Sequence, residues 1–360
     1  MNPSLQRVQD VADLRSEPEP DSESALVQLI RAELEPDRLE GTLDSAGERL
    51  PDRLWSGALR DPLCELLNRP GKDFRSRLVE AAYGLSCSPG PSRPMPPRLP
   101  LLVEALHAGS LIVDDIEDDS RYRRGKPALH VLVGVPLALN AGNWLYFLPH
   151  RLLEDLGLEA NVELQLRRAL DRGVLRCHYG QALDLGVRLG SLSQREVRGV
   201  VSLCTRLKTG SLLELAAEVG AIAACASSER ISELSRFGRS YGVALQMLDD
   251  VSGLYQQGRA HKGHEDLLNG RPTWPWAWLS ERVSELSYSR LQHQAREVER
   301  RDLHPEVLAE AVRRHLGIAP YRVIHADLQR AVARLKQHVP ASDALELLAA
   351  EVARLEHAYV

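Results

Sequence analysis

The residues with the clearest chemical potential form an acidic run, in which five of the six side chains from Asp114 to Asp119 are carboxylates. The run follows the apolar residues 110–113 directly. Residues four apart on an α-helix differ by about 40° around its axis, so Asp114 and Asp118 would share one face. Such crowding of like charge is unfavourable unless a cation binds, and carboxylate oxygens suit Mg²⁺ that also bridges to substrate phosphates. A solvated acidic helix end is the alternative, because charge runs are common on surfaces.

A second acidic pair interrupts an otherwise apolar helical segment, VALQMLDDV. Helical spacing places Gln246, Asp249 and Asp250 on one face of that segment. Carboxylates within a core-like helix are costly to bury and need a partner. Two such helices facing each other would form a pocket with carboxylates on opposite walls.

Basic residues occur at four separate places that could complement these carboxylates. They are Lys72 with Arg75, Arg123 with Arg124, Lys208, and Lys262. Arginine and lysine are the usual phosphate-binding side chains, although a single one is more often an ordinary surface residue. Together with the acidic clusters, the set indicates a substrate with two or more phosphates chelated through magnesium. No GxxxxGK[ST] and no GxGxxG after a strand occurs, so the pattern is not that of a nucleotide-binding loop.

The elements that must position these residues are predicted to be helices. Apolar residues recur at helical spacing in many segments, and no stretch alternates as a strand would. The clearest predicted helices span residues 78–85, 101–118, 135–156, 159–185, 194–226 and 228–255. Residues 88–100 hold six prolines and are predicted to be a loop. We expect one all-α domain over residues 25–360, with helices long enough to line a deep cavity, after a disordered acidic tail over residues 1–24.

Composition excludes several classes of protein. The 360 residues are 44% hydrophobic and 26% charged, which is typical of a globular protein, and the net charge of -5 argues against a nucleic-acid partner. No apolar run is long enough for a transmembrane segment, and the first residues lack the apolar core of a signal peptide. The five scattered cysteines show no zinc or disulfide pattern. The cytoplasm is the expected compartment.

Several motifs resemble those of the trans-isoprenyl diphosphate synthases, also called polyprenyl synthetases, and most of all the geranylgeranyl diphosphate synthases. In chain order they are PGKDFR, HAGSLIVDDIEDDSRYRRGKPALH, GQALDL, KTGSLLEL, LQMLDDVSGL and HKGHEDLLNGRPTWP. The resemblance implies an all-α isoprenoid synthase fold, a multi-helix bundle around a deep central cavity, and a homodimer. It also implies Mg²⁺-dependent head-to-tail condensation of isopentenyl diphosphate with an allylic diphosphate, with geranylgeranyl diphosphate as the expected product.

The resemblance also implies a role for each matching residue. The Mg²⁺ ligands would be Asp114, Asp115, Asp118, Asp249 and Asp250. The allylic diphosphate would be bound by Arg123, Lys208 and Lys262, assisted by Thr209, Gln181 and Gln246. Isopentenyl diphosphate would be bound by Lys72, Arg75, His107 and Arg124. Of these, the residues expected to be catalytic are Asp114, Asp115, Asp118, Lys208 and Asp249.

The chain departs from the family pattern around the second acidic pair. Gly253 stands where a third aspartate is common, which predicts weaker metal binding, and Arg271 replaces a usual lysine. The loop around Lys262 is about one residue shorter than in the family. The three tryptophans 274, 276 and 278 are expected to pack in the core.

Product length would depend on the residues at the floor of the cavity. The small Gly109 and Ser110 before the first acidic cluster would let a chain grow. The aromatic residues Trp144, Tyr146 and Phe147 could then stop it, or could simply pack in the core.

Two other functions remain open at this point. A class I terpene cyclase of the same fold needs the aspartates but not a second diphosphate site, so the presence of the latter residues favours a synthase. A non-catalytic regulatory subunit of a prenyl synthase should have lost the first acidic cluster, which is intact here.

Overall fold

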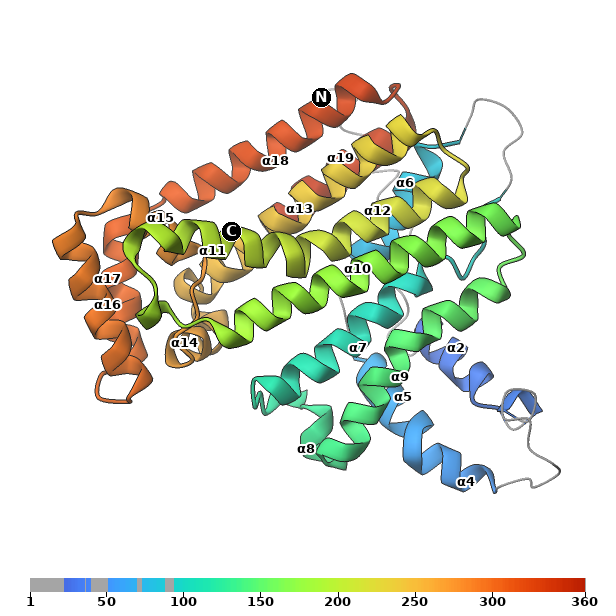
Figure 1. Cartoon of the computed structure of the whole chain (residues 1–360), viewed down its shortest axis with the longest axis horizontal. Coiled ribbons are helices and arrows are strands. Elements are labelled where there is room, and N and C mark those ends of the chain that lie inside the picture. The colour runs from blue at the N-terminus through green and yellow to red at the C-terminus, as the bar shows by residue number, and fades with distance from the viewer. Residues whose placement is uncertain (1–22, 36, 40–50, 70–72, 88–93, 360) are drawn as a thin grey trace, which may run out of the picture. The chain divides into compact units, whose positions relative to one another are not determined.

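The computed structural model describes residues 23–35, 37–39, 51–69, 73–87 and 94–359. Most of the expected disordered tail, Lys72 and residues 88–93 of the proline-rich loop lie outside these ranges. Helices dominate the part described (Figure 1), and its strands are limited to the two-residue β1 (Tyr122–Arg123) and β2 (Lys126–Pro127). The prediction of an all-α fold is therefore confirmed.

The chain divides into two compact units. One comprises Met1–Gly71 and Ala108–Trp144, and the other comprises Lys72–His107 and Leu145–Val360. Two helices, α7 (Leu101–Glu117) and α9 (Val135–Glu154), contribute residues to both units. The expectation of one domain over residues 25–360 stays a prediction.

The first unit is built from short helices around the end of α7 and the start of α9. Besides these two helices it contains α2 (Ala25–Glu33), α4 (Asp52–Trp55), the π-helix η1 (Ser56–Arg60), α5 (Asp61–Leu67), the β1–β2 pair and α8 (Leu129–Val133). Ser24 caps α2 by accepting a hydrogen bond from the Val27 backbone N–H, as serine commonly does at this position. Helix α5 contacts both α2 and α8.

The second unit holds the longest helices. Its elements after α6 (Phe74–Gly84) are α10 (Ala160–Gly186), η2 (Leu189–Ser191), α11 (Gln194–Thr205), the π-helix η3 (Arg206–Gly210), α12 (Ser211–Ala223), α13 (Ser228–Tyr255), η4 (Gln257–Arg259), α14 (Ala260–Leu268), α15 (Trp274–Arg282), α16 (Glu285–Glu299), α17 (Pro305–Leu316), α18 (Ala319–His338) and α19 (Asp343–His357). The bounds of α13 agree with those expected, and the other predicted helices shift by a few residues at their ends.

Helix α12 is the centre of this unit. It is buried along nearly its whole length, with Leu212, Leu213, Leu215, Val219 and Ile222 all in the core. A helix that is apolar on all sides must be enclosed by others, and α6, α10 and α13 pack around it. In Figure 1, α10, α12 and α13 run alongside one another. This arrangement fixes the helices that carry the second acidic pair and the Lys-Thr motif.

The predicted continuous helix over residues 194–226 is interrupted at one place. Between α11 and α12 the chain makes a π-helical turn at Arg206–Gly210, which contains Lys208 and Thr209. Single π-turns within helices are uncommon and often occur at functional sites. Apolar periodicity could not reveal this turn, because it adds one residue without breaking the helical pattern.

The tryptophan cluster packs as expected, with all three side chains at most 3% exposed. No helix in the described part of the chain is both long and apolar enough to cross a bilayer.

Candidate active site

The first acidic cluster lies where α7 ends. The Asp118 backbone N–H donates to the Asp114 carbonyl oxygen at 2.9 Å, so the helical turn continues one residue past the helix. Asp119 then adopts a left-handed conformation with φ 52°, and the Ser120 N–H donates back to the Asp115 carbonyl at 2.9 Å. This is the Schellman pattern of a helix end, here with aspartate where glycine is usual. It keeps Asp114 and Asp118 on successive turns, as the spacing predicted.

Asp115 forms the strongest contact of this cluster. Its side chain is buried, and the Arg123 Nε donates to Oδ1 at 2.9 Å and to Oδ2 at 3.1 Å. Arg123 also lies 4.0 Å from the Asp114 carboxylate. Burial raises the pKa of Asp115, and the neighbouring guanidinium only partly opposes that rise. The structure thus joins an expected metal ligand to an expected diphosphate-binding residue.

The hairpin after α7 fixes the two adjacent arginines. Its two-residue loop, Arg124 and Gly125, has φ values of 53° and 75°, the left-handed pair found in tight hairpin turns. The buried Arg69 donates to the carbonyl oxygens of Arg123 and Pro127 at 2.9 and 2.8 Å, and Arg124 donates to the Arg69 carbonyl at 2.8 Å. Arg69 is a support for the site that the sequence did not single out, because nothing marks an isolated arginine as buried.

In the second unit, Asp249 is paired with two cations. The Arg259 guanidinium contacts its Oδ1 and the Lys262 ammonium contacts its Oδ2. The structure therefore brings Lys262 directly to the second acidic pair, as expected. Arg259 was not expected here, because it belongs to none of the recognised motifs.

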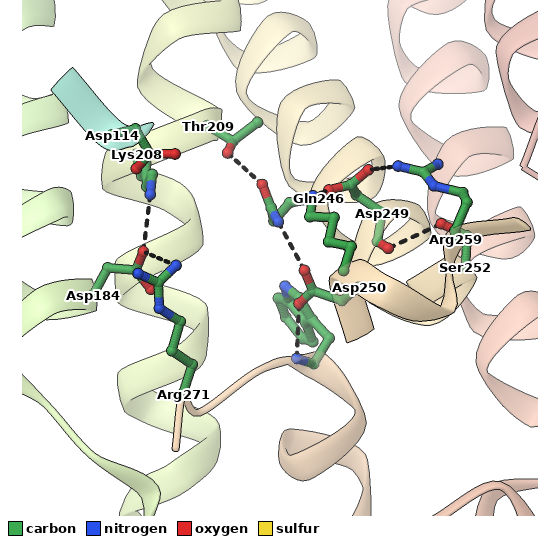
Figure 2. A network of polar contacts seen from close by, with 12 residues as sticks. Asp114, Asp184, Lys208, Thr209, Gln246, Asp249, Asp250, Ser252, Arg259 and Arg271 are labelled. Atoms are coloured by element: carbon green, nitrogen blue, oxygen red, sulfur yellow. Dashed lines mark hydrogen bonds and ion pairs between the residues drawn. The ribbon is translucent and has the colours of Figure 1, made fainter. Parts of the chain in front are cut away.

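The carboxylate of Asp250, unlike that of Asp249, accepts hydrogen bonds from neutral groups of the protein. Figure 2 shows a chain of hydrogen bonds in which Thr209 Oγ1 donates to Gln246 Oε1 and Gln246 Nε2 donates to Asp250 Oδ1, each at 2.7 Å. The other oxygen of Asp250 accepts from the Trp274 backbone N–H at 3.0 Å. Burial raises the pKa of Asp250 to about 7. Asp250 is thus buried with both oxygens accepting hydrogen bonds from neutral donors, whereas Asp249 is partly exposed and contacts cations.

Lys208 belongs to a neighbouring group of charges (Figure 2). Its Nζ lies 2.8 Å from Asp184 Oδ2, which is also 3.5 Å from Arg271 Nη1. Asp184 is the last polar residue of the GQALDL motif, and it had not been assigned a role. The GQALDL motif could have indicated Asp184, because Gln181 of the same motif was already expected to assist in binding the diphosphate.

A close backbone contact holds the π-turn that carries Lys208. A Cβ atom at Gly180 would lie 2.5 Å from the Lys208 backbone nitrogen, a distance that real Cβ atoms do not reach. Helix α10 can therefore approach η3 this closely only through glycine at that position.

Gly253 has a similar structural role. A Cβ atom at Gly263 would lie 2.2 Å from the Gly253 carbonyl oxygen, and one at Gly253 would lie 3.1 Å from the Gly263 nitrogen. Helix α14 thus packs backbone against backbone on α13. A side chain at position 253 would therefore be in tight contact with the α14 backbone next to Lys262.

The residues expected to bind isopentenyl diphosphate are less fully described. Arg75 lies at the start of α6 with its guanidinium 4.4 Å from the centre of the Phe74 ring, and His107 lies on α7. Arg124 belongs to the other unit, and Lys72 lies outside the described residues. Their assignment stays a prediction.

One observation bears on the expected cavity floor. Phe147 is 71% exposed, so its side chain does not pack in the core of the single chain. A Cβ atom at Gly142 would lie 3.3 Å from the Gly109 carbonyl oxygen, so α9 approaches the α7 backbone closely at this glycine. The expected effect of Gly109 and Ser110 on product length stays a prediction.

The donor atoms of both clusters suit a hard divalent cation. Within the described ranges, no three His, Cys, Asp or Glu side chains converge closely enough to hold a metal by themselves. Paired carboxylates suit Mg²⁺, which keeps several waters and takes further oxygens from substrate phosphates.

Comparison with known proteins gives consistent results. The family model for polyprenyl synthetases matches residues 56–312. The geranylgeranyl pyrophosphate synthase dpmaD of Metarhizium anisopliae is 34% identical over 60% of this chain and 62% of its own length. The geranylgeranyl pyrophosphate synthase janG of Penicillium janthinellum is 32% identical over 60% of this chain and 56% of its own length. The chain thus spans about three fifths of the length of these curated relatives.

Solved structures share the fold at low sequence identity. A decaprenyl diphosphate synthase from Rhodobacter capsulatus superposes with a TM-score of 0.74 at 21% identity, over 93% of this chain and 96% of that one. A polyprenyl synthase from Caulobacter crescentus, complexed with calcium and isoprenyl diphosphate, gives 0.70 at 22% identity, over 95% and 98%. These likenesses confirm the isoprenoid synthase fold.

Proposed function

Because this chain belongs to the polyprenyl synthetase family, we propose that it is a prenyltransferase that condenses isopentenyl diphosphate head to tail with an allylic diphosphate. The observation that carries the proposal is the pairing of carboxylates with cations in both acidic clusters. Asp115 is paired with Arg123, and Asp249 with Lys262. Such pairs offer carboxylate oxygens to a metal and cations to a diphosphate. The names of the curated relatives support geranylgeranyl diphosphate as the product.

Magnesium is the metal that these donors fit. Asp114, Asp115 and Asp118 would hold Mg²⁺ in the first unit, and Asp249 would hold it in the second. When bound, it supplies positive charge that stabilises the leaving diphosphate. Asp250 takes a different part in this proposal, because its oxygens already accept hydrogen bonds from Gln246 and Trp274. It orients Gln246 rather than binding metal.

The side chains of the second unit would bind the allylic diphosphate directly. Lys208 and Lys262 supply charge, and each can exchange its present carboxylate partner for a phosphate oxygen. Gln246 is fixed at both ends of its amide, by Thr209 and by Asp250, which leaves one amide N–H to donate. An amide held in this way is oriented before substrate arrives, so little ordering is required on binding.

The bond changes follow from the charge arrangement. The allylic C–O bond breaks, and the electron pair leaves with the diphosphate that the cations stabilise. The double bond of isopentenyl diphosphate attacks the allylic cation, forming the new C–C bond. The proton lost in this step passes to the departed diphosphate, so no dedicated protein base is required. Apolar surroundings that exclude water would protect the cation from hydrolysis.

A homodimer is part of the proposal. It is supported by large apolar side chains left on the surface of α9 and α10, among them Phe147, Leu175 and Tyr179. A location in the cytoplasm stays a prediction from the sequence.

One assay tests the proposed activity. The protein is incubated with isopentenyl diphosphate and with dimethylallyl, geranyl or farnesyl diphosphate in turn, with Mg²⁺ or with a chelator, and the products are identified by mass spectrometry. We expect linear prenyl diphosphates with Mg²⁺ and none with chelator. Cyclised hydrocarbon formed from one allylic diphosphate alone would instead identify a cyclase. Turnover that appears only after a second synthase is added would identify a regulatory subunit.

A further inference from the structure

We propose that Arg259 is an additional diphosphate-binding residue and that Tyr359 positions it. The inference rests on the proposed function and extends its allylic diphosphate site. Neither residue belongs to the motifs from which the site was predicted.

Arg259 is placed to act on the same ligand as Lys262. It ends the short helix η4, directly before α14, and its guanidinium contacts Asp249 Oδ1 while Lys262 contacts Oδ2. The side chains of Arg259 and Lys262 are 28% and 39% exposed, against 18% for Asp249. Both cations are therefore more exposed than the carboxylate that they contact, so a diphosphate arriving from solvent can reach them.

Arg259 is also held from a second direction. The centre of the Tyr359 ring lies 4.8 Å from the Arg259 guanidinium carbon, which is a cation–π distance, and the ring is buried. A long, flexible side chain that is fixed by an aromatic face loses less freedom when it binds a phosphate. Tyr359 lies after α19, more than ninety residues from Arg259, so this contact joins the end of the described chain to the site.

The arrangement of α14 makes this position possible. The close contact of Gly253 with Gly263 fixes α14 on α13, and the loop before Lys262 is short. The segment that carries Arg259 and Lys262 is therefore held against the helix that carries Asp249.

Two opposite effects follow from replacing Arg259. The Arg259→Gln variant loses one charge-assisted hydrogen bond to the diphosphate, so its affinity for diphosphate falls. The same change frees Asp249 from a competing cation, so its affinity for Mg²⁺ alone rises. General loss of structure would weaken both affinities together.

The test is isothermal titration of the full chain with Mg²⁺ alone and with inorganic diphosphate in the presence of Mg²⁺, alongside steady-state kinetics. For Arg259→Gln we expect Kd for diphosphate and KM for the allylic substrate to rise about tenfold, with kcat changed much less. The Kd for Mg²⁺ alone should fall. Arg314→Gln removes an exposed arginine paired with Glu310 on α17 and is the matched control, with all constants unchanged.

Variants of Tyr359 separate positioning from structure. Tyr359→Phe retains the ring and should match the wild type, whereas Tyr359→Leu should raise Kd for diphosphate about threefold. Unchanged diphosphate binding in Arg259→Gln, or weaker binding of both ligands, would overturn the assignment. Failure of the wild type to condense substrates, with the calorimetric pattern as expected, would refute the proposed activity and leave the Arg259 site standing.

Discussion

At the scale of single residues, the site is a set of carboxylates that already have cationic partners. Asp115 contacts Arg123, eight residues later, and Asp249 contacts Arg259, ten residues later. In both cases the cation comes from a short segment just beyond the helix that carries the acid. Pairing limits the repulsion between clustered carboxylates. In the proposed function, these cations would bind the diphosphate when a metal takes their place at the carboxylate.

Asp114 provides the most direct test of the first cluster. Its side chain is 22% exposed, and its carboxylate oxygen lies 4.0 Å from the Arg123 guanidinium, which is a weak contact. Removal of this side chain should therefore disturb the fold little. We expect Asp114→Ala to lower kcat at least about a hundredfold with a nearly unchanged melting temperature, because a metal ligand is lost. Glu117→Gln removes an exposed acid of the same run and should retain activity. Near-normal turnover by Asp114→Ala would refute its assignment as a metal ligand.

Asp249 and Asp250 should differ although they are adjacent. We expect Asp249→Asn to weaken Mg²⁺ binding, measured by titration calorimetry. Asp250→Asn should destabilise the fold by about 1–3 kcal/mol, because asparagine keeps one acceptor oxygen and its NH₂ group would face the other donor, either Gln246 Nε2 or the Trp274 N–H. Thermal denaturation measures that loss. An Asp250→Asn protein of unchanged stability that lost Mg²⁺ affinity would show that Asp250 is a ligand after all.

At the scale of elements, glycines determine how close the site-bearing helices come. Gly180 lets α10 approach the π-turn with Lys208, and Gly253 lets α14 dock on α13 beside Asp249. A family pattern in which position 253 holds an aspartate would suggest a lost ligand there. The contacts show instead that the position supports the segment that carries two cations.

The Gly253→Asp variant tests this interpretation. It restores the common third aspartate, yet we expect lower stability by about 1–3 kcal/mol and lower activity, because the new side chain displaces α14 from α13. Gly199→Asp is the matched control, since Gly199 is an exposed residue of α11 where a Cβ atom would meet nothing within 4 Å. Denaturant unfolding and the condensation assay measure the two effects. A Gly253→Asp enzyme that bound Mg²⁺ more tightly without loss of stability would contradict the packing role.

Sequence could predict elements and motif residues but not their contacts. Helical periodicity sufficed for the bounds of α13 and for placing Asp114 and Asp118 on successive turns, because these signals are local in the chain. Arg259 and Tyr359 escaped notice because their roles arise from tertiary packing between distant segments. The π-turn at Lys208 and the docking of Gly253 likewise depend on neighbouring helices that local sequence does not specify.

At the scale of the whole molecule, the exposed apolar surface of α9 and α10 argues for self-association. The rings of Tyr146 and His178 lie 5.3 Å apart, which places the two helices side by side in the second unit. Their sequence neighbours Phe147 and Tyr179 are 71% and 61% exposed, and Leu175 lies one helical turn before Tyr179. Aromatic residues that are exposed in a single chain are typical anchors of protein interfaces.

The Phe147→Asp, Tyr179→Asp double variant should therefore shift a dimer toward monomer, because burial of two new carboxylates at an apolar interface is unfavourable. Light scattering coupled to size exclusion measures the mass directly, and circular dichroism shows whether each monomer remains folded. Leu286→Asp is the matched control, since Leu286 is 64% exposed on α16, away from this surface, and its dimer should persist. If the double variant stays dimeric, the dimer interface lies elsewhere on the surface. If the wild type is monomeric at micromolar concentration, the proposed homodimer is refuted.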